Sequence, residues 1–213
     1  LGSQAVAAIQ QAGGSVVSVQ PGTSYDDSRA PNVFTIDPAN GGHYAKLFDV
    51  LSSRHGDAIK GVVYMWTLDH AAGIPAPGAE TAAIDKLGCN AVLLLTQALV
   101  TALPRAKLTI VTKGTQAVEA DGQALNVSSS PVWGFAQTLA QELPANFNGV
   151  VDLGFGDSNA AAESAQLAQE VCFPDKEDRV ALRGGERHVA RLRRAQPSGQ
   201  TYDFRPDGTY LIT

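Results

Sequence analysis

The chain has 213 residues, of which 44% are hydrophobic and 17% charged. This length and balance suffice for one α/β domain with a sizeable core and exclude disorder along the whole chain. A formal net charge of −5 gives no general reason to expect nucleic acid or an anionic membrane as a partner.

Two cysteines, Cys89 and Cys172, lie in apolar helical contexts. This usage argues against a secreted disulfide framework and predicts a pair of reduced core thiols in a cytoplasmic protein. The most apolar run, residues 91–95, is far too short to cross a bilayer, and no signal peptide is recognised.

Helical and extended patterns alternate along the first 174 residues. Apolar residues at three- and four-residue spacing predict helices, and short apolar runs between turn residues predict buried strands. Such alternation with short connections predicts a Rossmann-like α/β fold, a parallel sheet with helices on both faces. In chain order the expected elements are a helix at 2–13, a strand at 15–19, a polar loop at 21–32, a strand at 33–36, a helix at 41–55, a strand at 61–66, a long helix at 80–103, a strand at 108–112, a helix at 130–143, a strand at 149–153 and a helix at 157–171.

The helix expected at 130–143 is the best-marked element. Ser130 suits its N-cap and Pro131 its first turn, where a missing N–H is unpaired in any case. Gly134 and Ala140 keep parts of its surface small enough for another element to approach, and Pro144 ends it. One face carries an apolar stripe made of Val132, Phe135, Leu139 and Leu143.

The pattern changes after Pro174. Residues 179–182 and 186–192 flank Arg183-Gly184-Gly185 and predict a β-hairpin, and residues 194–208 form a polar connector rich in proline and glycine. The chain starts directly in a helix with no strand before it, and residues 208–213 resemble a strand that stops abruptly. We therefore expect a segment of a longer polypeptide, with a Rossmann-like subdomain at 1–174 and a hairpin that closes it at 175–194.

A dinucleotide site needs a glycine-rich turn between the first strand and the first helix, where backbone N–H groups meet the pyrophosphate. Only Gly2 stands at that place. Such a site also needs an acid or a base for the adenosine ribose after the second strand, and residues 19–22 offer neither. Asp26 or Arg29 could supply this acid or base only by turning back from the loop toward the ribose. The sequence therefore predicts that this chain binds no dinucleotide.

Other candidate sites are sparse. No nucleophile elbow or phosphate-binding loop is present. Trp66 and Trp133 are expected in the core rather than around a pocket. The dispersed histidines show no metal-ligand spacing and are expected at the surface or in loops: His43, His55, His70 and His188. A basic run consists of Arg191, Arg193 and Arg194. Its guanidinium groups could bind a phosphopantetheine or an acidic carrier. We favour a solvated strand edge or a contact with a following domain.

Seven segments, in order, match a known family: 61–69, 93–99, 107–118, 129–143, 148–153, 179–194 and 207–213. Together they resemble the structural subdomain of the ketoreductase region of modular type I polyketide synthases. The resemblance implies a non-catalytic half that braces a catalytic half, which binds NADPH and reduces the β-keto group of an intermediate held on an acyl carrier protein. Residues 195–213 would then be a linker and the first strand of that catalytic subdomain. Residues 141–144 (QELP) depart mildly from the family and leave the module type open.

The register of the family also shows which positions of this chain correspond to the catalytic residues of an active reductase. Carbonyl reduction needs a Tyr acid, a nearby Lys and a Ser that holds the carbonyl. That register places Leu125 at the Tyr and Ser129 at the Lys, within about one residue of slip. The Ser falls near Thr112 or Lys113, where ordinary β-structure is the better interpretation. Asn90 has the place of an Asn that distorts the corresponding helix in active relatives, although a helix residue bonded to the backbone is favoured.

We therefore expect no catalytic, cofactor-binding or metal-binding residue in this chain, and neighbouring synthase domains as its partners. Two alternatives stay open. One is a divergent short-chain reductase active by itself, with Tyr64 or Tyr202 as the acid. The other is a pseudo-ketoreductase scaffold in a fatty-acid or polyketide synthase.

Overall fold

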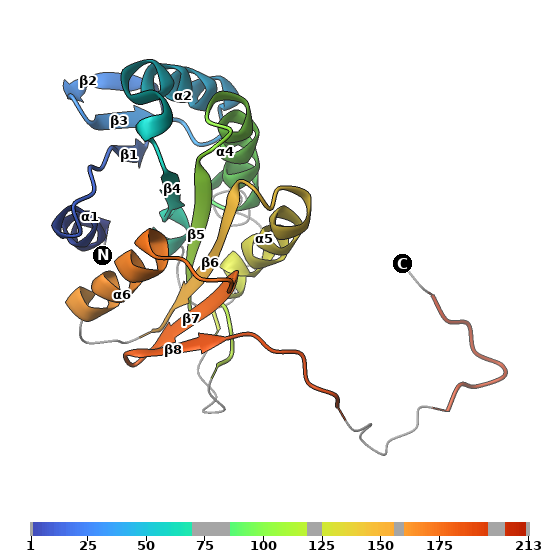
Figure 1. Ribbon diagram of the computed structural model, residues 1–213. Coiled ribbons are helices and arrows are strands. Elements are labelled where there is room, and N and C mark those ends of the chain that lie inside the picture. Colours follow the sequence, from blue (N-terminus) through green and yellow to red (C-terminus); the bar gives the residue numbers. More distant parts are fainter. Residues whose placement is uncertain (1, 70–85, 119–124, 156–159, 196–202, 212–213) are drawn as a thin grey trace.

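A computed structural model describes residues 2–69, 86–118, 125–155, 160–195 and 203–211 of the chain. Its largest element is a five-stranded sheet in the order β4 (Gly61–Tyr64), β5 (Lys107–Lys113), β6 (Phe147–Leu153), β7 (Arg179–Arg183) and β8 (Glu186–Val189) (Figure 1). The first four strands are parallel, and β8 runs antiparallel to β7. Burial of β5 and β6 along almost their whole length explains their continuous apolar runs.

A second, three-stranded sheet has the order β1 (Ser18–Pro21), β3 (Val33–Ile36) and β2 (Asp26–Ala30). The predicted Rossmann-like α/β fold with a parallel-rich sheet is confirmed, and its strands are divided between two sheets, because β1 and β4 do not pair. The expectation of a loop over 21–32 is wrong. β2 pairs antiparallel with β3 and is mostly exposed, so backbone pairing forms this strand without any apolar pattern in its sequence.

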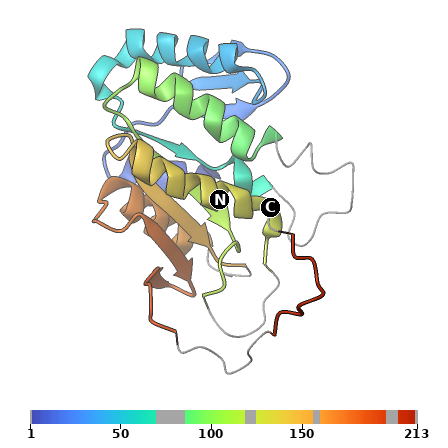
Figure 2. The ribbon, with the colours of Figure 1, turned by 90° about the vertical axis from the view of Figure 1, so that its right-hand side faces the viewer.

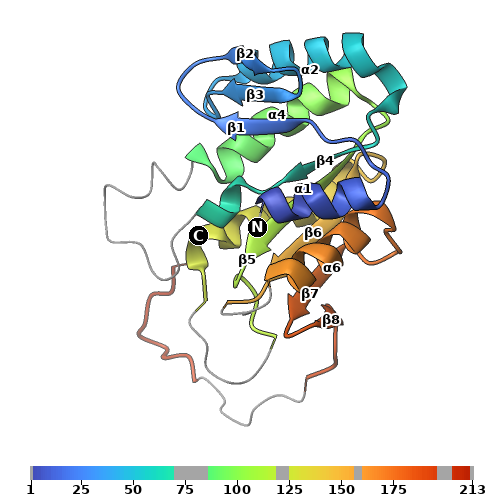
Figure 3. The same ribbon diagram turned by 90° about the vertical axis from the view of Figure 1, so that its left-hand side faces the viewer.

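Helices cover both faces of the five-stranded sheet (Figures 1 and 3). α1 (Gly2–Gln11) packs against α6 (Ala160–Cys172) on one face, over the core cluster that contains Ala5 and Leu167. On the other face lie α4 (Cys89–Ala102) and α5 (Ser130–Glu142), whereas α2 (Gly41–His55) packs against α4 and β3 of the smaller sheet; the buried residues of all three helices belong to the larger core cluster. Among the described residues there are also three short 3₁₀ turns, η1 (Gly56–Ala58), η2 (Trp66–Asp69) and η3 (Val127–Ser129).

Two predicted helix starts need correction. The long helix expected at 80–103 is interrupted by a turn at residues 87–88, so α4 begins at Cys89; residues 80–85 lie outside the described chain. The N-cap of α5 is Ser129 rather than Ser130, and no side-chain bond caps it, while Pro131 lies in the first turn as predicted. Cys172 is exposed at the end of α6 instead of in the core, and it forms no disulfide.

The apolar stripe of α5 is largely confirmed. Val132 and Leu139 are buried, together with Trp133 and Ala136, whereas Phe135 and Leu143 are half-buried against the same core. Gly134 lies on the exposed side, where a Cβ atom would meet nothing within 4 Å. Within the described part of the chain, therefore, no element uses the close approach that Gly134 allows.

The predicted hairpin is confirmed as β7 and β8. Gly184 and Gly185 have φ of 54° and 89°, which is the two-residue turn that matches strand twist. Because β7 also pairs with β6, the hairpin continues the main sheet. The second strand ends at Val189 rather than at Leu192, which is fully exposed.

The strand expected at the C-terminal end is not formed in its described part, residues 207–211. Residues 203–211 are exposed and include a turn, with the Phe204 and Tyr210 rings 4.8 Å apart. A strand requires a hydrogen-bonded neighbour, and none of the described strands lies beside this segment. The division of the chain at 174 and 194 stays a prediction.

Candidate functional site

The carboxyl ends of β5 and β6 form the edge at which open α/β sheets bind their ligands. The segment after β5, the turn η3 and the start of α5 meet at this edge (Figure 2). These are also the segments in which the sequence places the positions of a reductase's acid and of its partners. The groups found at this edge therefore decide what chemistry the chain can perform.

At the position of the acid, Leu125 is 37% exposed and has no proton to donate. At the position of the lysine, Ser129 is fully buried, and its Oγ lies 3.5 Å from both Asn126 Nδ2 and the carbonyl oxygen of Thr67. The Asn126 backbone N–H donates to the Gly114 carbonyl at 2.8 Å, which holds η3 against the end of β5. These residues fix the loop and offer no acid to a substrate.

The hydroxyl at the position of the carbonyl-binding serine is already engaged. Thr112 is completely buried, and its Oγ1 donates to Asp152 Oδ1 at 2.6 Å. The Thr115 hydroxyl donates to Asp152 Oδ1 as well, and the backbone N–H groups of Thr115 and Gln116 donate to the carboxylate at 3.0–3.1 Å. Because Thr112 uses its only proton in this way, it cannot also polarise a carbonyl.

An arginine completes this cluster. Arg183, at the end of β7, places Nη2 2.5 Å from Asp152 Oδ2 and 2.9 Å from the Gln116 carbonyl oxygen, and its Nη1 donates to the Asp152 carbonyl at 2.8 Å. The side chain of Asp152 is 0% exposed and that of Arg183 11%. We call Thr112, Thr115, Asp152 and Arg183 the Asp152 cluster. It ties the ends of three neighbouring strands to the loop after β5 and leaves the buried carboxylate fully bonded.

This cluster was not predicted from the sequence. One signal was available, since Asp152 is a charged residue in a strand that is buried along almost its whole length, and a charge in such a place needs a partner. The partner Arg183 lies 31 residues away, at the end of β7. Only the parallel pairing of β6 with β7 brings the two residues together.

The tyrosine offered as an alternative acid is also buried. Tyr64 is 3% exposed, and its hydroxyl donates to the Leu87 carbonyl at 3.0 Å. Burial raises the pKa of Tyr64 above its ordinary value, and the neighbouring Tyr44 and Asp69 raise it further. A catalytic tyrosine needs the opposite shift. The other alternative, Tyr202, lies outside the described residues.

The described residues do not fit a dinucleotide. Asp26 and Arg29 lie on the strand β2, where their side chains pair with each other at 3.1 Å instead of reaching back to the end of β1. Gly2 is the first residue of α1. We therefore derive no chemical step through a nicotinamide cofactor bound here.

The described histidines are scattered. His43 Nδ1 accepts the Asp37 N–H at 3.0 Å, His55 is exposed at the end of α2, and His188 lies on β8 with Nε2 3.7 Å from Glu186. His70 falls outside the described residues. Among the described side chains, no three His, Cys, Asp or Glu residues are grouped so that they could hold a metal ion. Asn90 is half-buried in the first turn of α4.

Both tryptophans belong to the core as expected. Trp133 is buried, and Trp66 is half-buried with its ring 5.4 Å from that of Tyr64. In the basic run, Arg191 is bound within the chain, since its guanidinium lies 2.6–2.7 Å from both carboxylate oxygens of Glu177. Arg193 and Arg194 are exposed.

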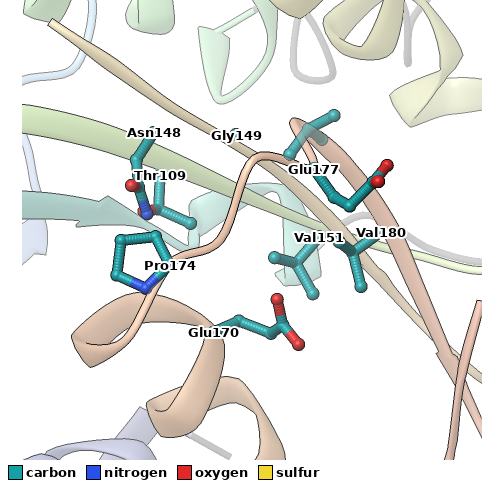
Figure 4. Close-up of a pocket in the computed structure, with 9 residues that line it drawn as sticks. Thr109, Asn148, Gly149, Val151, Glu170, Pro174, Glu177 and Val180 are labelled. Atoms are coloured by element: carbon teal, nitrogen blue, oxygen red, sulfur yellow. The ribbon is translucent and has the colours of Figure 1, made fainter. Parts of the chain in front are cut away.

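A small pocket lies between β6, β7 and the end of α6, with Glu170 and Glu177 on its wall (Figure 4). Its volume is about 250 Å³ including open solvent, less than is typical of ligand pockets. Glu170 is paired with Arg187 at 2.5 Å, and Glu177 with Arg191. The pocket is near the amino ends of the strands, away from the edge where such folds bind ligands. The two glutamates of the pocket therefore have a structural role as partners of these arginines.

Comparison with known protein families shows to which family the chain belongs. The family model described as polyketide synthase extender module SpnB, Rossmann fold domain, matches residues 7–192. The chain belongs to this family. It is a Rossmann domain of the ketoreductase region of a modular polyketide synthase.

Relatives agree with this assignment. This Rossmann domain is 31% identical over 174 residues to the pikromycin polyketide synthase component PikAII of Streptomyces venezuelae, a match that covers 79% of the chain and 4% of that protein. It is 32% identical over 154 residues to the erythronolide synthase EryA3 of Saccharopolyspora erythraea, covering 66% of the chain and 5% of the relative. It is 32% identical over 114 residues to a phenolphthiocerol/phthiocerol polyketide synthase of Mycobacterium tuberculosis, covering 53% of the chain and 7% of the relative. The Rossmann domain thus spans a small part of these multidomain polypeptides.

Solved structures give the same fold. A C2-type ketoreductase from a modular polyketide synthase superposes with a TM-score of 0.65 at 26% identity, over 92% of this chain and 39% of the other. A short-chain dehydrogenase from Streptomyces avermitilis superposes with a TM-score of 0.60 at 18% identity, over 86% and 84%. The polyketide synthase Rossmann domain therefore shares the Rossmann-like fold of ketoreductases and short-chain dehydrogenases. None of its described helices is long and apolar enough to span a membrane.

Proposed function

We propose that this Rossmann domain is a non-catalytic structural subdomain that stabilises the NADPH-dependent β-ketoacyl ketoreductase of its polyketide synthase. One observation carries the proposal: at the edge where a reductase holds its substrate, Leu125 stands at the position of the acid and the Asp152 cluster occupies the hydroxyl of Thr112. At the two positions where the family's register places the acid and the carbonyl-binding hydroxyl, the described side chains offer no free proton donor.

The outer surface of α4 and α5 supports a bracing role. The two helices lie side by side (Figure 2), and α4 carries no charged residue while α5 carries only Glu142, at its end. Three large apolar side chains on or just before these helices are 37–41% exposed: Leu93, Leu125 and Val127. Depletion of charge around exposed apolar groups is typical of the centre of a protein interface. We assign this α4–α5 surface to the contact with the catalytic subdomain.

The remaining parts of the proposal follow from the family. NADPH binds in the adjoining catalytic subdomain, and the acyl carrier protein presents its substrate there. Other synthase domains of the same polypeptide are further partners, and the parent polypeptide works in the cytoplasm. The raised pKa and the buried hydroxyl of Tyr64 count against a reductase active by itself.

Two measurements test the proposal. The isolated chain, titrated with NADPH and followed by cofactor fluorescence, should show no saturable binding. Joined to the catalytic segment encoded downstream, it should support NADPH oxidation with a β-ketoacyl thioester. A dissociation constant on the order of 10 µM or below for the isolated chain, with turnover of the thioester, would contradict the proposal and favour the reductase. A downstream segment that lacks its own tyrosine or glycine-rich loop would favour the scaffold.

A matched pair of variants tests the α4–α5 surface. Leu93→Asp puts a charge on this surface and should lower the ketoreductase activity and the thermal midpoint of the joined protein, because an unpaired charge would be buried in the interface. Phe173→Asp is the control, since Phe173 is 65% exposed at the end of α6, on the opposite face of the sheet. Equal effects of the two substitutions would place the contact elsewhere.

A further inference from the structure

Two of the exposed apolar side chains of the α4–α5 surface lie on a short segment just before α5. Leu125 is 37% exposed and Val127 41%, whereas Asn126 between them is only 1% exposed. With Asn126 turned inward, its two neighbours are turned outward. Leu125 and Asn126 belong to no described helix or strand, so their orientation depends on contacts with other parts of the chain.

A backbone hydrogen bond ties this segment to the residue that follows β5. The Asn126 N–H donates to the Gly114 carbonyl at 2.8 Å. The side chain of Asn126 adds a contact of 3.5 Å to Ser129 Oγ, which is at the long limit of a hydrogen bond. The position of Gly114 therefore decides where Leu125 and Val127 lie.

Gly114 and the two residues after it are bonded in turn to β6. The Gly114 N–H donates to the Leu153 carbonyl at 2.7 Å. The N–H groups of Thr115 and Gln116 donate to the Asp152 carboxylate at 3.0–3.1 Å. Three consecutive N–H groups thus meet two consecutive residues of one strand. An ionised carboxylate suits this place, because both of its oxygens accept hydrogen bonds and neither donates one.

Arg183 holds the same loop from β7. Its Nη2 lies 2.9 Å from the Gln116 carbonyl oxygen and 2.5 Å from Asp152 Oδ2. Because the two charged side chains are only 0% and 11% exposed, solvent and salt screen this pair little. A continuous series of contacts therefore runs from the buried ion pair through residues 114–116 and Asn126 to the exposed apolar side chains.

We propose that Asp152 and Arg183 are positioning residues for the α4–α5 surface. Through this series of contacts they hold Leu125 and Val127 in the orientation that the catalytic subdomain contacts. The inference rests on the proposed function, since it takes the catalytic subdomain as the occupant of that surface. A surface that is ordered before association loses less conformational entropy when it binds. The ion pair thus supports the interface although Asp152 itself is completely buried.

Thiol labelling at position 127 tests this role. Val127→Cys is made in the isolated chain and in the joined protein, and its reaction with a maleimide is followed by mass spectrometry of the labelled peptide. Contact with the catalytic subdomain should make labelling in the joined protein about tenfold slower than in the isolated chain, or slower still.

Two substitutions in the Asp152 cluster should remove this protection. Asp152→Asn should speed the labelling of the joined protein by about tenfold, the order of effect expected when one backbone hydrogen bond no longer holds the segment. In the isolated chain the same substitution should change the rate little, because Val127 is exposed there already. Arg183→Lys keeps the charge but cannot reach both Gln116 and Asp152 as the guanidinium does, so its effect should be smaller. It carries the same test if Asp152→Asn does not fold.

Leu167→Ala is the matched control. Leu167 is 1% exposed in the core cluster on the opposite face of the sheet, and its truncation also destabilises the fold. At a temperature at which both variants stay folded by circular dichroism, labelling of the joined Leu167→Ala protein should stay slow. Equally fast labelling with Leu167→Ala and Asp152→Asn would indicate a general loss of stability and overturn the proposal.

The remaining outcomes separate this inference from the proposed function. A cysteine at position 127 that stays protected in the joined Asp152→Asn and Arg183→Lys proteins would overturn the positioning role and leave the proposed contact intact. Equal labelling of the isolated chain and the joined protein, with Val127→Cys as the only substitution, would contradict the proposed contact and the positioning role together.

Discussion

Replacing Asp152 by Asn removes the charge at the centre of the Asp152 cluster while it keeps the size of the side chain. The carboxylate accepts hydrogen bonds from Thr112, Thr115, Gln116 and Arg183. In asparagine one of the two oxygens is replaced by an NH₂ group, which would face some of these donors and cannot accept a hydrogen bond from them. Arg183, only 11% exposed, would lose its counter-charge.

Breaking a buried pair at one partner costs about 3–5 kcal/mol, because the other charge stays buried and unpaired. We expect Asp152→Asn to lower the free energy of unfolding by about 3 kcal/mol, which for a domain of this size lowers the thermal midpoint by roughly 6–12 °C. Urea denaturation followed by circular dichroism measures the loss. Asp57→Asn is the control, since Asp57 pairs with Arg105 at 2.7 Å with both side chains more than 75% exposed, and such pairs contribute little.

Arg183→Met completes a double-mutant cycle. If the pair acts as described, the double variant should be more stable than the sum of the single losses predicts, because neither charge is then left without its partner. A loss below about 1 kcal/mol for Asp152→Asn, or additive losses in the cycle, would refute the reasoning, because a buried pair broken at one partner costs several times more.

Two further predictions use the backbone and Tyr64. Gly114 has φ of 64°, and a Cβ there would overlap the ring of Phe155, so Gly114→Ala should cost about 2–4 kcal/mol of unfolding free energy. Gly134→Ala, on the exposed face of a helix, should instead add about 0.5–1 kcal/mol. Denaturant titration of both variants checks this, and equal effects would contradict it. Tyr64→Phe should lower the free energy of unfolding by about 1 kcal/mol, because the hydrogen bond to the Leu87 carbonyl is lost. The ketoreductase activity of the joined protein, measured as NADPH oxidation, should stay unchanged. Loss of turnover would make Tyr64 catalytic.

Much of the local structure was predictable from the sequence. The core strands β5 and β6 and the face of α5 that holds Val132 and Leu139 follow from periodicity, and the turn at Gly184 and Gly185 follows from residues that tolerate positive φ. The lack of an acid at Leu125 is a matter of residue type. These features depend on neighbours within a few positions along the chain, so they can be recognised without coordinates.

Other features were decided only in three dimensions. β2 exists because the exposed residues 26–30 pair with β3, an interaction that leaves no apolar pattern in the sequence. The separation of β1 from β4 depends on which strands find hydrogen-bonded neighbours. Asp152 and Arg183 meet because β6 and β7 are parallel neighbours, although 31 residues separate them. Residue types and their spacing determined most elements of this protein and the leucine at position 125, whereas long-range strand pairing decided how its sheets divide and how its buried charge is neutralised.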